Sequence, residues 1–233
     1  MMRLDAMIRI DATCDRLTVD LDAPAATVVT LTAGLYTPGE LAAHLEARLQ
    51  AVDDADWTCT LSTAGVFEFG ATGHDIYVTW TRPTLRDALG WAADISASAD
   101  TATAPATSPC VFVAGVPWDD PAPLGWRLHT SRSESHRHRG RSFIRSALRT
   151  WEVTARATSA ELPQLRGVLE RLARGVPGRW WRHTDVATAF EFTSPAGYVD
   201  VHLASESWPD RWLAGGGARL IAELPLQFLE RTP

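Results

Sequence analysis

The sequence predicts an α+β protein that is mainly β, built as two β-sandwich-like domains that each carry one amphipathic helix. Short segments with alternating apolar and polar residues dominate both halves of the chain, which is the period of half-buried strands. Each half also contains one segment whose leucines recur every three or four residues, as in an amphipathic helix. A chain of 233 residues is long enough for two small domains, each with a buried core.

Most of the first half is expected to form short strands. Alternation around Ile8 and Ile10, and from Leu17 to Leu21, indicates two of them, and the β-branched run 26–34 indicates a third. A hairpin is predicted in which Trp57, Cys59 and Leu61 fall on one face, a turn follows at Ala64 and Gly65, and the second strand contains Val66, Phe67 and Phe69. Alternation of Ile76, Val78 and Trp80 predicts another strand.

The clearest helix of the first half is predicted near 38–51. Thr37 is suited to be its N-cap, Pro38 suits the first helical position, and Glu40 completes a T-x-x-E capping box. An apolar stripe of Leu41, Leu45 and Leu49 follows.

The first half ends in a less regular stretch. Residues 82–91 indicate a short helix with Thr84 as its cap and Gly90 as its stop. Residues 92–109 are small and polar, which is typical of a surface loop or linker, and a strand is expected to follow them near 110–118.

The second half repeats this mixture in a different order. Residues 143–157 indicate one long strand, or two strands with a bulge. A helix is predicted near 160–174, with Gly175 as its end. Strands are expected to follow, including a pair in which Phe190 and Phe192 face Val199 and Val201. Pro225 within the last strand predicts an edge position or a bulge.

We therefore predict an N-terminal β-rich domain at 1–115 and a C-terminal β-sandwich domain at 143–233. Between them, residues 116–142 form a connecting segment or arm, rich first in Pro and Trp and then in Arg and His.

Charge is distributed unevenly along a chain whose net charge is −6. All basic residues are arginine. Residues 1–126 hold six arginines against seventeen acidic residues, whereas residues 127–149 hold seven arginines against Glu134 alone. An acidic half followed by a compact basic segment favours complementary protein–protein contacts or nucleic-acid binding.

No known catalytic motif is present, so we expect no catalytic residues, no cofactor and no metal. The three cysteines are widely separated, and the acidic pairs Asp53/Asp54 and Asp119/Asp120 belong to no spaced ligand set. His136 and His138 have metal-ligand spacing, but the arginines beside them oppose a cation. No apolar run is long enough for a membrane helix, and the N-terminal stretch lacks the apolar region of a signal peptide, so no membrane partner is expected.

Arginines of the basic segment and tryptophans in loop-like contexts are the candidate inter-subunit contacts. Loop tryptophans are enriched at interfaces because one side chain buries a large area. The candidates are Arg132, Arg137, Arg139, Arg141, Arg145, Trp118, Trp126, Trp208 and Trp212.

The first half resembles a module of tailed-bacteriophage structural proteins. The module has a strand ending in G-x-Y-[ST], a helix of the form LAxxLxxxL, a hairpin with G-x-F-x-F, and a short helix ending in LG-[FW]. In this chain these are Gly34 to Thr37, Leu41 to Leu49, Thr58 to Phe69 and Leu89 to Trp91. Residues 149–183 and the strands after them resemble the sandwich-plus-helix domain of tail-tube and distal-tail proteins. The chain departs from that family in placing the module first and a long Arg/His segment between the halves.

The resemblance implies a non-enzymatic structural protein of a phage or phage-like tail, located in the virion and assembled in the host cytoplasm. It implies a ring oligomer, with a hexamer among the expected stoichiometries, which connects other tail or baseplate proteins. Two other classes stay open. One is a nucleic-acid-contacting protein that uses residues 127–149, although the rest of the chain is acidic and no aromatic residue interrupts 127–142. The other is a carbohydrate-binding module that uses the loop tryptophans.

Overall fold

The computed structural model describes residues 3–21, 26–52, 56–115, 118, 122–133, 141–181, 198–205, 207, 211–214 and 220–231, and it describes side chains for these except 122–149, 181 and 211–214. The chain divides into two compact units. The N-terminal unit comprises Arg3–Val113 with Gln164–Arg171, and the C-terminal unit comprises Met1–Met2, Ala114–Pro163 and Leu172–Pro233. The predicted α+β, mainly β class is confirmed.

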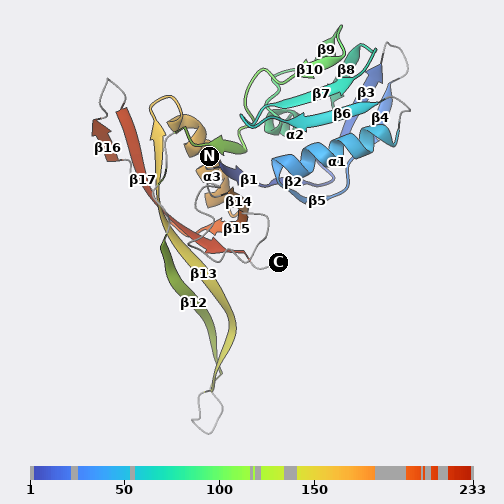
Figure 1. The fold of residues 1–233 in the computed structure, drawn as a ribbon. Coiled ribbons are helices and arrows are strands. Elements are labelled where there is room, and N and C mark those ends of the chain that lie inside the picture. The colour runs from blue at the N-terminus through green and yellow to red at the C-terminus, as the bar shows by residue number, and fades with distance from the viewer. Residues whose placement is uncertain are drawn as a thin grey trace. The chain divides into compact units, whose positions relative to one another are not determined.

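Two antiparallel sheets form most of the N-terminal unit (Figure 1). A four-stranded sheet has the order β4-β3-β8-β9, with bounds Thr27–Thr30, Arg16–Leu21, Ile76–Trp80 and Ile95–Ala97. A three-stranded sheet has the order β10-β7-β6, with bounds Thr101–Thr103, Phe67–Ala71 and Trp57–Leu61. Phe69 and Trp80 bring the two sheets together, with 6.2 Å between their ring centroids, so the core of this unit lies between them.

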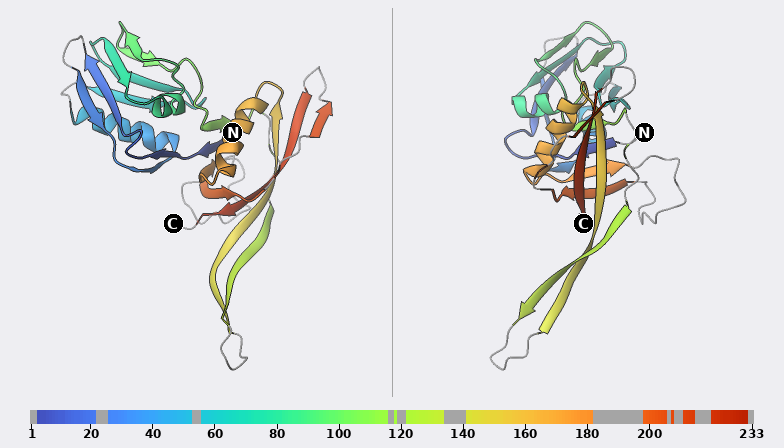
Figure 2. Two further views of the ribbon diagram at one scale, coloured as in Figure 1. Left: turned by 180° about the vertical axis from the view of Figure 1, so that it is seen from behind. Right: turned by 90° about the vertical axis from the view of Figure 1, so that its left-hand side faces the viewer.

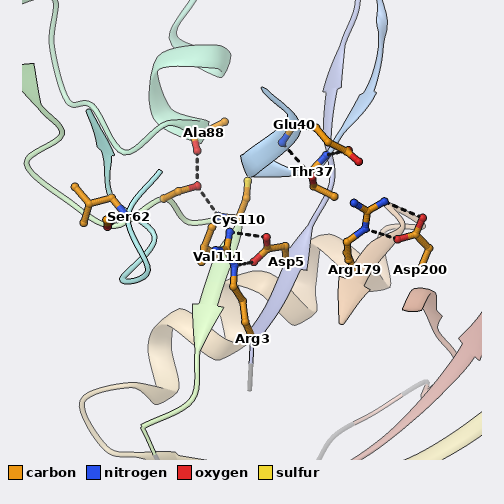
Figure 3. A network of polar contacts seen from close by, with 12 residues as sticks. Arg3, Asp5, Thr37, Glu40, Ser62, Ala88, Cys110, Val111, Arg179 and Asp200 are labelled. Carbon is orange, nitrogen blue, oxygen red and sulfur yellow. Dashed lines mark hydrogen bonds and ion pairs between the residues drawn. The ribbon is translucent and has the colours of Figure 1, made fainter. Parts of the chain in front are cut away.

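Two shorter strand pairs complete the N-terminal unit. Strand β2 (Ile8–Ile10) pairs with β5 (Gly34–Tyr36), and β1 (Arg3–Ala6) pairs with β11 (Val111–Val113). Asp5 on β1 is fully buried, and Arg3 binds both of its carboxylate oxygens at 2.7 Å (Figure 3). The pairing supplies the partner that a buried carboxylate requires.

Helix α1 (Pro38–Gln50) confirms the predicted helix and its capping box. The backbone N–H of Glu40 donates to Thr37 Oγ1 at 3.3 Å, and the Thr37 N–H donates to Glu40 Oε2 at 2.9 Å (Figure 3). Leu41, Leu45 and Leu49 are fully buried, as their spacing predicts.

Helix α2 (Pro83–Ala88) corrects one detail of the sequence analysis. Its N-cap is Arg82, and no side chain caps it, so Thr84 is not the cap. Pro83 takes the first helical position, where the missing N–H costs nothing, so the helix starts one residue before Thr84 and its N-cap is two residues before it. Gly90 does end the helix: its φ is +86°, and a Cβ there would collide with the carbonyl oxygen of Ala106.

The stretch 92–109 is not only a loop, as its composition had indicated. Strand β9 pairs with β8 from Ile76↔Ala97 to Val78↔Ile95, and β10 pairs with β7 from Thr101↔Gly70 to Thr103↔Glu68. Each strand has three residues, which is too short for an alternating pattern of small residues to reveal it. The segment therefore supplies an edge strand to both sheets.

Helix α3 (Leu162–Ala173) confirms the predicted second helix, but part of it belongs to the N-terminal unit. Gln164 Nε2 donates to the Val111 carbonyl oxygen at 2.8 Å. Leu165, Val168 and Leu169 are fully buried. A second reciprocal cap precedes the helix, with the Thr158 N–H donating to Glu161 Oε2 at 2.9 Å. Among the described helices, none is long and apolar enough to cross a membrane.

One antiparallel sheet organises the C-terminal unit. Its strand order is β14-β15-β17-β13-β12, and β16 pairs with the same side of β17 as β15 does. The bounds are β12 (Ala122–Ser133), β13 (Arg141–Thr158), β14 (Gly178–Trp181), β15 (Tyr198–Leu203), β16 (Arg211–Ala214) and β17 (Leu220–Glu230). The expected pairing of Phe190 and Phe192 lies outside the described residues.

Pro225 occupies a local edge of β17. Its strand pairs with β13 over 221–229, while on the other side β16 covers 220–223 and β15 covers 228–230. The Gln227 N–H donates to Ser205 Oγ, so the odd-numbered residues of β17 direct their backbone groups away from β13. The nitrogen of Pro225 therefore faces the gap between β16 and β15, where no ladder hydrogen bond is lost.

We expect two substitutions in α3 to have opposite effects. Leu165→Ala should lower the free energy of unfolding by about 2–5 kcal/mol because it removes fully buried methyl groups. Gly167→Ala should raise it by up to about 1 kcal/mol, since a Cβ there meets no atom within 4 Å and the glycine is inside a helix. Urea denaturation followed by circular dichroism measures both free energies. If both substitutions change the free energy of unfolding in the same direction and by the same amount, this packing is contradicted.

His44 should make stability depend on pH. Thr32 N–H donates to His44 Nε2 at 3.0 Å, and the ring stacks on Tyr36, so the folded state needs a neutral imidazole. Burial, and then Arg48, hold the pKa of His44 below its usual 6.5. Because the unfolded state binds the proton more readily, this contribution is complete above pH 6.5 and is lost as pH falls below it.

Thermal unfolding at pH 7.5 and pH 5.5 tests this for the wild type and for His44→Gln. We expect the wild type to lose more stability on acidification than the variant does. His202 also has a pKa lowered by burial and remains in both proteins, so only the difference between them reports on His44. Identical acid responses would contradict the role of His44.

Candidate assembly ribbon

Strands β12 and β13 form a two-stranded antiparallel hairpin that extends beyond the sheet of the C-terminal unit (Figures 1 and 2). Their register runs from Ala122↔Glu152 to Ser133↔Arg141, with irregularities between Pro123 and Gly125 and between His129 and Thr130. Strand β17 pairs with β13 only over 150–158. We call residues 125–133 and 141–149 the ribbon; at the usual strand rise it is about 30 Å long.

Both edges of the ribbon are unpaired among the described residues. Each strand of the ribbon pairs only with the other, so one row of backbone N–H and C=O groups on each strand has no strand beside it. An isolated two-stranded hairpin is marginally stable in water. The ribbon therefore has the backbone geometry of an element that another chain can extend or cover.

Charge on the ribbon has one sign. Its residues include five arginines and no acidic residue: Arg127, Arg132, Arg141, Arg145 and Arg149. Arg132 is opposite Ser142, Ser133 is opposite Arg141, and Arg145 is the extra residue where the register shifts. Three of these five arginines, Arg132, Arg141 and Arg145, are among the contacts predicted from the sequence. Arg127 and Arg149 also belong to the ribbon.

The structure brings together only part of the predicted contact set. Arg132, Arg141, Arg145 and Trp126 belong to the ribbon, whereas Trp212 is on β16. Outside the described residues are Arg137, Arg139 and Trp208, together with the pairs Asp53/Asp54, Asp119/Asp120 and His136/His138.

Trp118, one of the predicted contacts, is largely buried within its own chain. Its side chain is 6% exposed, and its indole N–H donates to the Arg156 carbonyl oxygen at 3.0 Å. Arg156 is on β13 beyond the part that β12 covers, and Glu223 of β17 is directly opposite it. Trp118 thus satisfies an edge carbonyl of its own chain and offers little area to another subunit.

The sheet next to the ribbon is held by aromatic packing and by cross-strand ion pairs. Trp180 lies 6.4 Å from Trp151 and 5.7 Å from Phe228, measured between ring centroids. Arg156 pairs with Glu223 at 2.9 Å, on directly opposite residues of β13 and β17. This packing fixes the part of β13 from which the ribbon continues.

A second ion pair supports β14 and β15. Arg179 Nε donates to Asp200 at 2.7 Å (Figure 3), and the guanidinium lies 3.9 Å from the Tyr198 ring centroid. Arg179 and Asp200 are opposite each other in the register, so the pair reinforces the strand pairing.

The described residues contain no arrangement that indicates chemistry at a metal or a thiolate. No group of three or more His, Cys, Asp or Glu among them could hold a metal ion. Burial raises the pKa of the Cys59 and Cys110 thiols, which favours the unreactive protonated form.

Comparisons with family models, curated proteins and solved structures found no match to this chain.

We expect Trp118→Phe to destabilise the chain without changing its assembly. Phenylalanine keeps most of the apolar area but cannot donate to the Arg156 carbonyl, which should cost about 1–3 kcal/mol. Urea denaturation and light scattering at matched concentrations measure the two effects. If the variant keeps its free energy of unfolding but changes its oligomer mass, Trp118 is an inter-subunit contact, as predicted from the sequence.

Proposed function

We propose that the chain is a non-enzymatic structural protein that assembles with copies of itself, and that its setting is the tail of a phage or phage-like particle. The observation that carries the assembly step is the ribbon, whose two edges are unpaired among the described residues. Ordering such an element costs conformational entropy that a two-stranded hairpin recovers only in part. Burial against another subunit offsets that cost.

The setting rests on the sequence resemblance described above. The order of β5, α1, the β6–β7 hairpin and, after β8, the short helix α2 is compatible with that resemblance. In this proposal the chain forms a ring, with a hexamer among the expected sizes, and connects other tail or baseplate proteins. The virion tail is its location, after assembly in the host cytoplasm.

Nucleic-acid binding is the second candidate, and one observation favours it. The major groove of duplex DNA accepts a two-stranded β-ribbon, and five arginines on a ribbon can neutralise phosphates. A filter-binding titration of the full chain with duplex DNA at increasing salt separates the candidates. A steep loss of affinity with salt, reduced by arginine substitutions in the ribbon, would favour this candidate over protein–protein assembly.

Shortening the ribbon tests the proposed assembly directly. Residues 127–148 are replaced by Asn-Gly, which joins the opposite residues Trp126 and Arg149 by a two-residue hairpin turn. We expect a folded protein that sediments as a monomer, whereas the full chain forms an oligomer. The register from Ala122 to Gly125 is retained, so unfolding of the sheet should be little changed.

Two results would contradict the proposal. One is a full chain that stays monomeric at all concentrations and salt conditions in analytical ultracentrifugation. The other is a shortened chain that forms the same oligomer as the full chain, because the ribbon would then have no part in assembly. Electron microscopy of the oligomer determines whether it is a closed ring.

A further inference from the structure

The strand ends of the N-terminal unit gather aspartates at one end of its two sheets. Strand β3 ends opposite the start of β8 at Leu21↔Ile76, and Ile76 is opposite Ala97 at the end of β9. In the other sheet, β6 begins where β7 ends, at Trp57↔Ala71. Only residues 72–75 separate the end of β7 from the start of β8, and only residues 98–100 separate the end of β9 from the start of β10, so both sheets meet at this end.

We call this the aspartate end, and its described acidic residues are Asp20, Asp56, Asp75 and Asp100. Asp56 and Asp100 are exposed, and Asp20 and Asp75 are half-buried. The C-terminus of α1 lies at the same end, because Gln50 Nε2 donates to the Trp57 carbonyl oxygen at 2.9 Å. A helix C-terminus adds partial negative charge.

The described strand ends and turns here, 20–21, 49–52, 56–57, 70–76 and 97–101, contain no arginine. Arg48 lies in the last turn of α1, and its Nε donates to the Thr30 carbonyl oxygen at 2.8 Å. At the opposite end, Arg16 begins β3 and Arg82 follows β8. The ion pairs Arg16–Asp15 and Arg86–Asp87 occur there. The described residues of the aspartate end therefore carry more negative than positive charge, with four aspartates against Arg48 in the last turn of α1.

The ribbon is the matching positive element of the same chain. Pairing the ribbons of two copies edge to edge would bring five arginines against five arginines, and like charges across an interface cost several kcal/mol. Docking a ribbon on the aspartate end brings opposite charges together. Charge therefore favours a contact between different surfaces of two copies over a symmetric contact between two ribbons.

We propose that the ribbon of one copy docks on the aspartate end of the N-terminal unit of a second copy. This inference rests on the proposed self-assembly and specifies its partner surface. Each copy then presents one ribbon and one aspartate end, so the contact is head to tail. A head-to-tail contact closes into a ring when the rotation between copies permits, and otherwise continues as a filament.

Three charge-reversal variants of the full chain test the contact. The ribbon variant carries Arg132→Glu, Arg141→Glu and Arg145→Glu. The aspartate-end variant carries Asp20→Arg, Asp56→Arg and Asp100→Arg, and the combined variant carries all six changes. A control reverses three acidic residues elsewhere: Asp15→Arg, Asp87→Arg and Glu170→Arg.

Analytical ultracentrifugation at 50 mM and 500 mM NaCl measures self-association, and circular dichroism verifies folding. We expect the ribbon variant and the aspartate-end variant each to self-associate at least about tenfold more weakly than wild type at low salt. The two variants mixed together, and the combined variant alone, should recover association because opposite charges again face each other. The control should match wild type, and high salt should weaken every association.

Other outcomes overturn the inference and separate it from the proposed function. A wild-type oligomer that neither variant weakens contradicts the docking contact but leaves self-assembly standing. If only the ribbon variant loses self-association, and mixing it with wild type restores association, the contact is a symmetric one between two ribbons. If the charge-reversal variants change the free energy of unfolding but not the oligomer mass, the ribbon docks within its own chain. A monomeric wild type contradicts both proposals.

Discussion

The pairing of β13 with two different strands is the constraint on which the C-terminal unit depends. Over 150–158 it pairs with β17, and over 141–152 it pairs with β12, so only a short overlap is covered on both sides. Trp151 in this overlap packs against Trp180, which also stacks on Phe228. The ribbon is thus the continuation of a strand that is anchored in a packed sheet, and its direction is set there.

Elsewhere in the C-terminal unit, the sheet avoids unpaired backbone groups at two edge positions. Trp118 donates to the edge carbonyl of Arg156, and Pro225 occupies a gap between two neighbouring strands. The edges of the ribbon, in contrast, face no described strand. The contrast supports an external partner for the ribbon, and its arginines together with the aspartate end favour a second copy of the chain.

The sequence predicted individual helices and strands better than it predicted which strands pair with each other. The T-x-x-E pattern at Thr37 is sufficient to place α1, because a capping box depends only on residues three apart. The basic segment was predicted only as a loop or an extended arm, without its strand register, since residues 129–133 have no apolar alternation and strand pairing depends on residues far apart in the chain. Strands β9 and β10 were missed for the same reason. The hydrogen bond of Trp118 could not be predicted, because its acceptor, Arg156, is 38 residues away in the chain. The aspartates of the aspartate end are separate turn residues in the sequence, and only the register brings them together.

Hydrogen–deuterium exchange of the full chain at two protein concentrations tests the central claim most directly. If another copy covers the ribbon, its backbone amides should exchange rapidly in dilute protein and become protected as the protein assembles. Peptides from the aspartate end should gain protection over the same concentration range, while those from β17, which pairs with β13 over 221–229, should not change. Ribbon peptides that exchange at the same rate at both concentrations, while the mass increases, would contradict this account.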